Sequence, residues 1–103
     1  MKLRDAKVLF EQLRHDTWRL VLSTHVLRDH PERKFTADTI IALIQGSGRL
    51  ADNKMPSAVP KSFMWFCKDE AEEACELVVK FESLDAKHNE IILVISAYRK
   101  VKK

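Results

Sequence analysis

Three segments typical of β-strands follow one another in the second half of the chain and restrict its fold more than any other part. They cover residues 61–68, 75–82 and 91–98, and short polar links span 69–74 and 83–90. Residues 75–82 alternate apolar with polar side chains, as a strand with one buried face does. Links of this length join antiparallel neighbours. Segment 91–98 is apolar on both faces, which predicts a central place in the sheet.

The first half of the chain predicts two helices around one further strand. Residues 3–13 carry apolar side chains at helical spacing. Residues 17–24 are rich in aromatic and β-branched residues and alternate like a half-buried strand. A polar connection over 25–34, with a helical turn before its proline, leads to a short second helix at about 37–45.

The ends of this second helix carry recognisable signals. Thr36 has the side chain of an N-cap, and Phe35 before it is placed to pack on Ile40. Gly46 stands where a glycine commonly ends a helix. Residues 46–60 contain both glycines and two of the three prolines, so we expect a loop of about fifteen residues.

The expected order is therefore helix, strand, helix and three strands in a single domain covering residues 1–103. This order predicts an α+β fold, with two helices from the N-terminal half packed on a mostly antiparallel four-stranded sheet. With 46% hydrophobic and 32% charged residues, the composition is that of a globular chain rather than a disordered one.

Several classes of protein are disfavoured by the sequence. The longest uncharged stretch, residues 39–48, is far shorter than the roughly 20 residues that span a bilayer. The first residues alternate in charge, and no apolar signal core follows them. Cys67 and Cys75 cannot form a disulfide scaffold and suit a reducing compartment. We therefore expect a complete small cytoplasmic protein without a membrane partner.

Charge is distributed unevenly along a chain whose formal net charge is +3. The acidic residues of one segment are Asp69, Glu70, Glu72, Glu73 and Glu76. Two segments are basic: 25–34 holds His25, Arg28, His30, Arg33 and Lys34, and 99–103 holds Arg99, Lys100, Lys102 and Lys103. If the basic segments meet in space, they form a patch well away from the acidic turn that is compatible with nucleic acid.

The first candidate for chemistry is the group His25, Arg28 and His30 after the first strand. An imidazole exchanges a proton near pH 7, and a guanidinium binds phosphate through its planar fork. The alternative interpretation is an ordinary solvated loop, since histidine and arginine are common in such loops.

The second candidate is the end of the last strand, with Ser96, Tyr98, Arg99 and Lys100. Alternation predicts Ser96 and Tyr98 on one face and Arg99 on the other. Tyr98 can stack on a base and Arg99 can bind phosphate. The alternative is a strand end with a solvated basic tail.

Other patterns carry weaker signals. Arg49 follows a Gly-Ser-Gly run that lacks the setting and spacing of a phosphate-binding loop. Cys67 and Cys75 lack the spacing of a zinc site and are interpreted as small buried hydrophobes. The acidic segment 69–76 is interpreted as a solvated face. We therefore expect no metal and no cofactor.

Two stretches carry a resemblance to a known family. Ser23-Thr24-His25-Val26-Leu27-Arg28 runs from a strand into a His-x-x-Arg segment, and Phe35 to Ile41 opens a helix with threonine. With this order of elements, residues 17–99 resemble the RelE-like ribonuclease-toxin fold, which includes barnase-like and colicin-type tRNases. Departures are the spacing of three residues between histidine and arginine, the additional His30 and a net charge lower than in many toxins.

The resemblance implies cleavage of RNA without a metal, by attack of a 2′-hydroxyl on its own phosphate. It assigns His25 as base or acid, Arg28 and Arg99 to the phosphate, and Tyr98 or Ser96 to the nucleotide. We add His30, Arg49 and Lys100 as substrate-binding candidates. It also implies an antitoxin protein as a partner.

Three functional hypotheses follow. The leading one is a metal-independent endoribonuclease of the toxin type. The second is a non-catalytic module that binds RNA or protein on the same surface. The third is a small structural or phage-associated protein that forms a homodimer through an apolar sheet face containing Met64, Trp65 and Phe66.

Overall fold

A computed structural model describes residues 2–29, 35–54, 61–83 and 90–99 of the 103-residue chain. It has two α-helices, two short helical turns (η) and five strands. In chain order these are α1 (Leu3–Leu13), η1 (Thr17–Arg19), β1 (Leu20–Leu22), η2 (His25–Asp29), α2 (Ala37–Gln45), β2 (Gly48–Asp52), β3 (Phe63–Lys68), β4 (Ala74–Ser83) and β5 (Glu90–Arg99). The α+β class and the helical turn before Pro31 are confirmed.

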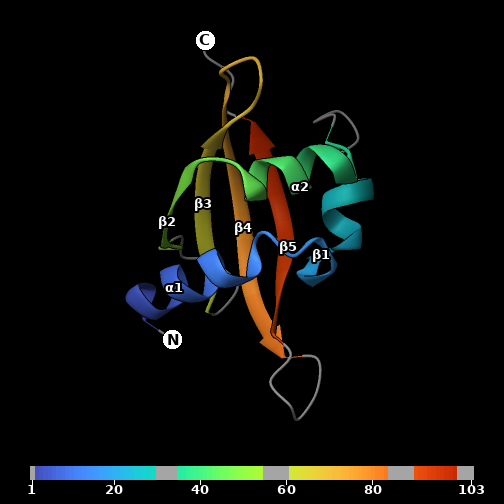
Figure 1. Cartoon of the computed structure of the whole chain (residues 1–103). Coiled ribbons are helices and arrows are strands. Elements are labelled where there is room, and N and C mark those ends of the chain that lie inside the picture. The colour runs from blue at the N-terminus through green and yellow to red at the C-terminus, as the bar shows by residue number, and fades with distance from the viewer. Residues whose placement is uncertain (1, 30–34, 55–60, 84–89, 100–103) are drawn as a thin grey trace.

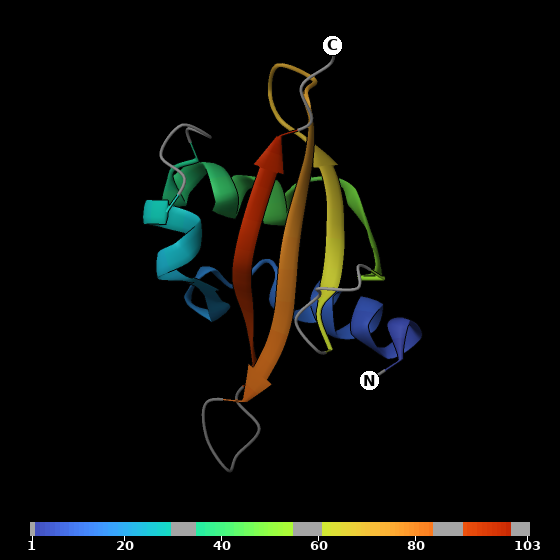
Figure 2. The ribbon, with the colours of Figure 1, turned by 180° about the vertical axis from the view of Figure 1, so that it is seen from behind.

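The strands form one mixed sheet in the order β1-β5-β4-β3-β2. β1 is parallel to β5, and every other neighbouring pair is antiparallel. The predicted four-stranded sheet is therefore wrong by one strand, although its mostly antiparallel character and the interior place of β5 are confirmed. Both α-helices lie on one face of the sheet, and the view from behind shows the strands in front of them (Figures 1 and 2).

The additional strand is β2, which lies inside the segment predicted to be a loop. Leu50 at its centre is buried and pairs in register with Trp65 of β3. Because glycines and an arginine flank this single buried position, the local sequence shows no alternation that would predict a strand. The predicted strand 17–24 is shorter than expected, because residues 17–19 form η1 and leave Trp18 exposed.

The core lies between the helices and the sheet face that they cover. Trp65 connects its parts, since its ring centroid lies 4.6 Å from that of Phe10 in α1. Its indole Nε1–H donates to the carbonyl oxygen of Leu43 in α2 at 2.9 Å. Fully buried side chains around it include Ile40, Ile44, Leu77, Val79, Ile92 and Val94.

α2 begins and ends where predicted, at Ala37 and Gln45, but Gly46 does not take the conformation usual for a glycine at a helix end. The Thr36 Oγ1 accepts from the Thr39 N–H at 3.1 Å, which confirms the N-cap. Phe35 packs against the core. Gly46 has φ −87°, outside the left-handed region, so the helix does not end there through the conformation that favours glycine. Instead, the Gly46 carbonyl oxygen accepts from Arg14 Nη1 at 2.8 Å.

Gly48 is required by a close approach of β2 to β3. A Cβ atom at this position would lie 2.6 Å from the Phe66 carbonyl oxygen and 2.6 Å from Trp65 Cζ2. Because one neighbour is strand backbone and the other a buried ring, Gly48→Ala should lower the free energy of unfolding by about 2–3 kcal/mol. Urea denaturation measures this loss. Gly46→Ala is the control, since its Cβ meets no atom closer than 3.2 Å; equal losses would contradict the proposed clash.

Candidate functional site

The parallel pairing of β1 with β5 brings the segment that carries the first predicted group beside the strand that carries the second. Leu20 pairs with Ile92 and Leu22 with Val94, and the chain then continues in the direction of β5 before it turns into η2. η2 contacts β5, beside the upper half of that strand in Figure 1. The segment with His25 and Arg28 therefore flanks the C-terminal part of β5.

Ser23 fixes η2 to β5, and the sequence did not single it out as a functional residue. Its N–H donates to the Val94 carbonyl oxygen at 3.0 Å, and its hydroxyl donates to the Ile95 carbonyl oxygen at 3.0 Å. The same hydroxyl accepts from the Val26 N–H at 3.2 Å, which caps the turn. The β4–β5 register skips Ile95, because Val78 pairs with Ser96 while Val79 pairs with Val94. The serine thus joins η2 to a β-bulge.

The end of β5 divides its side chains between the two faces, as alternation predicts. Ala97 belongs to the core beneath the helices, and Arg99 lies on the same side, over the Phe35 ring. Ser96 and Tyr98 take the opposite face, where Ser96 is buried and Tyr98 is 38% exposed. Of these two residues, Tyr98 is therefore the one with the more exposed side chain on that face.

Arg99 is held in place rather than part of a solvated tail. Its Nε lies 3.3 Å from Asp69 Oδ2, and its Cζ lies 4.3 Å from the Phe35 ring centroid. The expectation that the basic groups lie well away from the acidic turn is therefore wrong for Arg99. A guanidinium has five N–H donors, so pairing with one carboxylate is compatible with a second anion.

Asp69 organises the β3–β4 turn, so interpreting it as part of a solvated face is also wrong. Its Oδ1 accepts from the N–H groups of Ala71 at 2.9 Å and Glu73 at 3.0 Å. The turn places Glu72 at φ 62°. The hydrogen bond from Glu73, with those from Ala71 and Arg99, holds the pKa of Asp69 below its usual range.

This lowered pKa predicts a pH-dependent stability difference between the wild type and Asp69→Asn. A carboxyl whose pKa is lower in the folded state stabilises the fold above its unfolded pKa, and the contribution is lost as the pH falls. The wild type should therefore be more stable than Asp69→Asn at pH 7, and the difference should shrink below about pH 4. Urea denaturation from pH 7 to pH 3 measures it; a difference independent of pH would contradict this role.

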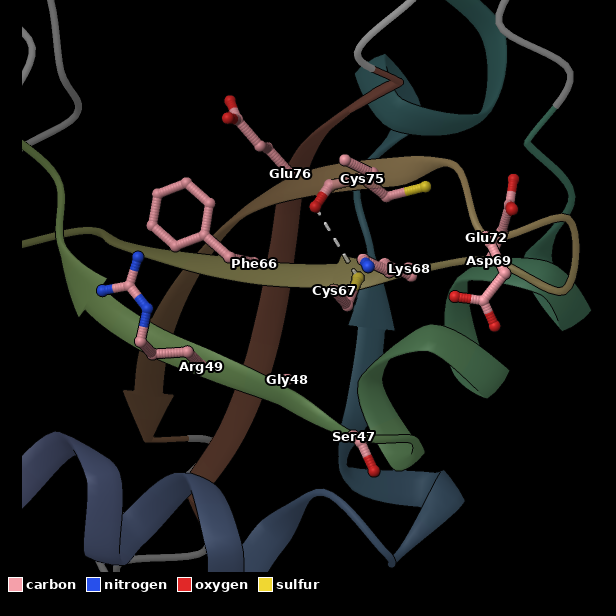
Figure 3. A pocket seen from close by; sticks show the side chains of 11 residues that line it. Ser47, Gly48, Arg49, Phe66, Cys67, Lys68, Asp69, Glu72, Cys75 and Glu76 are labelled. Atoms are coloured by element: carbon pink, nitrogen blue, oxygen red, sulfur yellow. Dashed lines mark hydrogen bonds between the residues drawn. The ribbon is translucent and has the colours of Figure 1, made fainter.

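Arg49 lies at the far edge of the sheet, on β2, and the fold does not bring it to η2. It lines a cavity of about 630 Å³ where β2 begins and β3 turns into β4 (Figure 3). Its guanidinium Cζ lies 4.8 Å from the Phe66 ring centroid. Other lining residues are Ser47, Gly48, Cys67, Lys68, Asp69, Glu72, Ala74, Cys75 and Glu76.

The two cysteines face each other in register across β3 and β4, and both are free and buried. Burial raises the pKa of Cys67 to about 12 and also raises that of Cys75. These are properties of buried structural thiols rather than reactive ones.

Among the described residues, no cluster of three or more histidine, cysteine or acidic side chains is arranged to hold a metal ion. No helix within those residues has the length and apolar character needed to cross a membrane. The candidates His30 and Lys100 lie outside the described residues.

Comparisons of the chain with protein-family models, curated proteins and solved structures find no match.

Proposed function

We propose that the protein is a cytoplasmic, metal-independent endoribonuclease of the toxin type that acts where η2 flanks β5. The observation that carries the proposal is the packing of two segments that the sequence selected separately. Ser23 and Ile95 are 72 positions apart and share a hydrogen bond, so the His25–Arg28 segment lies beside the strand end with Tyr98.

The chemistry of this cleavage needs a base, a cationic group and an acid. The base takes the proton of the 2′-hydroxyl, whose oxygen bonds to phosphorus. The bond from phosphorus to the 5′-oxygen breaks, and the acid protonates that oxygen. In this proposal His25 serves in proton transfer, Arg28 stabilises the phosphorane and Tyr98 orients the nucleotide. The other two candidates do not fit this site as well, since Arg99 is on the opposite face beside Asp69 and Ser96 is buried. The products carry a 2′,3′-cyclic phosphate and a 5′-hydroxyl.

The test is cleavage of a fluorescent single-stranded RNA by the purified protein in excess EDTA. The proposal predicts cleavage that survives EDTA and leaves 2′,3′-cyclic phosphate ends. Absence of cleavage at micromolar protein, with and without ribosomes, would overturn it. An inhibitory antitoxin belongs to the same proposal and would suppress this activity.

A non-catalytic RNA-binding protein is the second candidate. The pairing of Arg99 with Asp69 favours it, because a cation already balanced by a carboxylate stabilises a developing negative charge less. Binding of the same RNA without cleavage would select this candidate.

A further inference from the structure

A row of four side chains crosses four strands on the sheet face opposite the helices. Arg49 pairs in register with Phe66, Phe66 with Glu76, and Glu76 with Tyr98. Their chain neighbours Leu50, Trp65, Cys75 and Ala97 all belong to the core beneath the helices. Since alternate residues of a strand take opposite faces, the row lies on the face seen in front in Figure 2.

The row combines two aromatic rings with a positioned cation. Phe66 is half-buried and carries the Arg49 guanidinium on its ring at 4.8 Å, and Tyr98 is partly exposed. The strands of Phe66 and Tyr98 are separated by two strand spacings, roughly 9–10 Å. Aromatic rings and guanidinium planes on a sheet are surfaces on which unpaired bases stack.

We propose that this row, Arg49-Phe66-Glu76-Tyr98, is a base-stacking subsite for single-stranded RNA. One base stacks on the Arg49–Phe66 pair and another on Tyr98. The Glu76 carboxylate between them accepts a hydrogen bond from a base that has an exocyclic amino group, which favours adenine, cytosine and guanine over uracil. The inference rests on the proposed function and adds to it a binding surface remote from His25.

The distribution of charge favours RNA over a second copy of the chain as the occupant. Arg49 stands at one end of the row, on the edge strand β2, and η2, which carries Arg28, contacts β5 at the other end. The only acidic member, Glu76, lies between the rings, where it meets a base rather than a phosphate. A homodimer through this row would bury Arg49 and Glu76, and burying charges is costly.

The cavity in Figure 3 gives the Phe66 end of the row the depth that a base requires. Arg49, Phe66 and Glu76 all line it, together with Lys68. Its volume of about 630 Å³ lies within the range of roughly 300–1,000 Å³ seen for small-ligand sites. From a nucleotide bound in this cavity, the RNA chain would continue along the row toward Tyr98 and η2.

The test measures the binding of fluorescent ten-nucleotide RNAs by anisotropy and the KM for cleavage. Phe66→Leu removes the ring and retains an apolar side chain, and Arg49→Gln removes the charge. Each should weaken binding of oligo(A) by roughly 5- to 100-fold, the effect of losing one stacked base, and should raise KM more than it lowers kcat. Lys80→Gln is the control. Lys80 lies on the same sheet face but outside the row, paired with Leu93, so this variant should bind RNA as the wild type does.

Base selectivity supplies a second readout that a structural defect would not produce. The wild type should bind oligo(A) and oligo(C) more tightly than oligo(U), and Glu76→Gln should narrow that difference. Equal affinity for all three homopolymers would overturn the role of Glu76.

The outcomes separate this inference from the proposed function. If the wild type cleaves RNA while Phe66→Leu and Arg49→Gln leave the Kd and KM unchanged, the subsite is overturned and the nuclease stands. If the row binds RNA and no cleavage occurs in EDTA, the nuclease is overturned and the subsite stands. A Phe66-dependent dimer in sedimentation, without RNA binding, would overturn the subsite in favour of a protein interface.

Discussion

Replacing Trp65 by alanine is expected to lower the free energy of unfolding by about 3–5 kcal/mol. The side chain is 4% exposed, so its loss leaves a large cavity at the centre of the core. The substitution also removes the ring contact with Phe10 of α1 and the hydrogen bond to the Leu43 carbonyl oxygen of α2. Both helices thereby lose part of their attachment to the sheet.

Two companion variants separate the contributions of the indole. Trp65→Phe retains a ring and removes the N–H donor, which satisfies a carbonyl in the last turn of α2. Trp65→Phe should lower the free energy of unfolding by about 1–2 kcal/mol. Trp18→Ala should change stability by less than about 0.5 kcal/mol, because Trp18 is 62% exposed. Urea denaturation followed by circular dichroism measures all three, and similar losses for Trp18→Ala and Trp65→Ala would contradict the described core.

Replacing His25 by alanine is expected to reduce the rate of RNA cleavage by about 10²–10³-fold, the usual effect of removing one catalytic group. The reason is its place in η2, where Ser23 holds the turn against the end of β5. The measurement is kcat/KM on single-stranded RNA in EDTA.

His15→Ala is the matched control. His15 is an exposed histidine after α1 whose Nε2 lies 3.4 Å from Glu11, and it belongs to neither η2 nor β5. Its removal should leave kcat/KM within about 2-fold. Equal losses in the two variants, or an unchanged rate in His25→Ala with an intact fold, would remove His25 from the mechanism.

Local patterns were sufficient to predict α1, α2 and the three C-terminal strands, because each carries a clear helical or alternating period. β2 could not be predicted in this way. Its sequence, Gly-Arg-Leu-Ala-Asp, offers one buried position, and it becomes a strand through pairing with β3 and through Leu50. The parallel pairing of β1 is equally non-local, since two helical elements and three strands separate β1 from its partner β5 along the chain.

The sequence was sufficient to select candidate residues for the site by their chemistry. It was not sufficient to predict how they are arranged in space. His25 and Tyr98 were selected by their chemistry, whereas the contact between their elements, η2 and β5, depends on the β1–β5 pairing. The contact between Asp69 and Arg99 joins residues 30 positions apart and leaves no local signal. The row through Phe66 and Glu76 depends on the register that the Asp69 turn sets between β3 and β4.

The central claim is that η2 and the end of β5 form one RNA-cleaving site, and a double-mutant cycle tests it most directly. The measurement is kcat/KM for RNA cleavage in EDTA by the wild type, His25→Ala, Tyr98→Ala and the double variant, and each single variant should lower it. Residues that act as a unit give strongly non-additive losses. The account predicts that the double variant is nearly as active as His25→Ala alone; losses that multiply, or a wild type that does not cleave RNA, would contradict it.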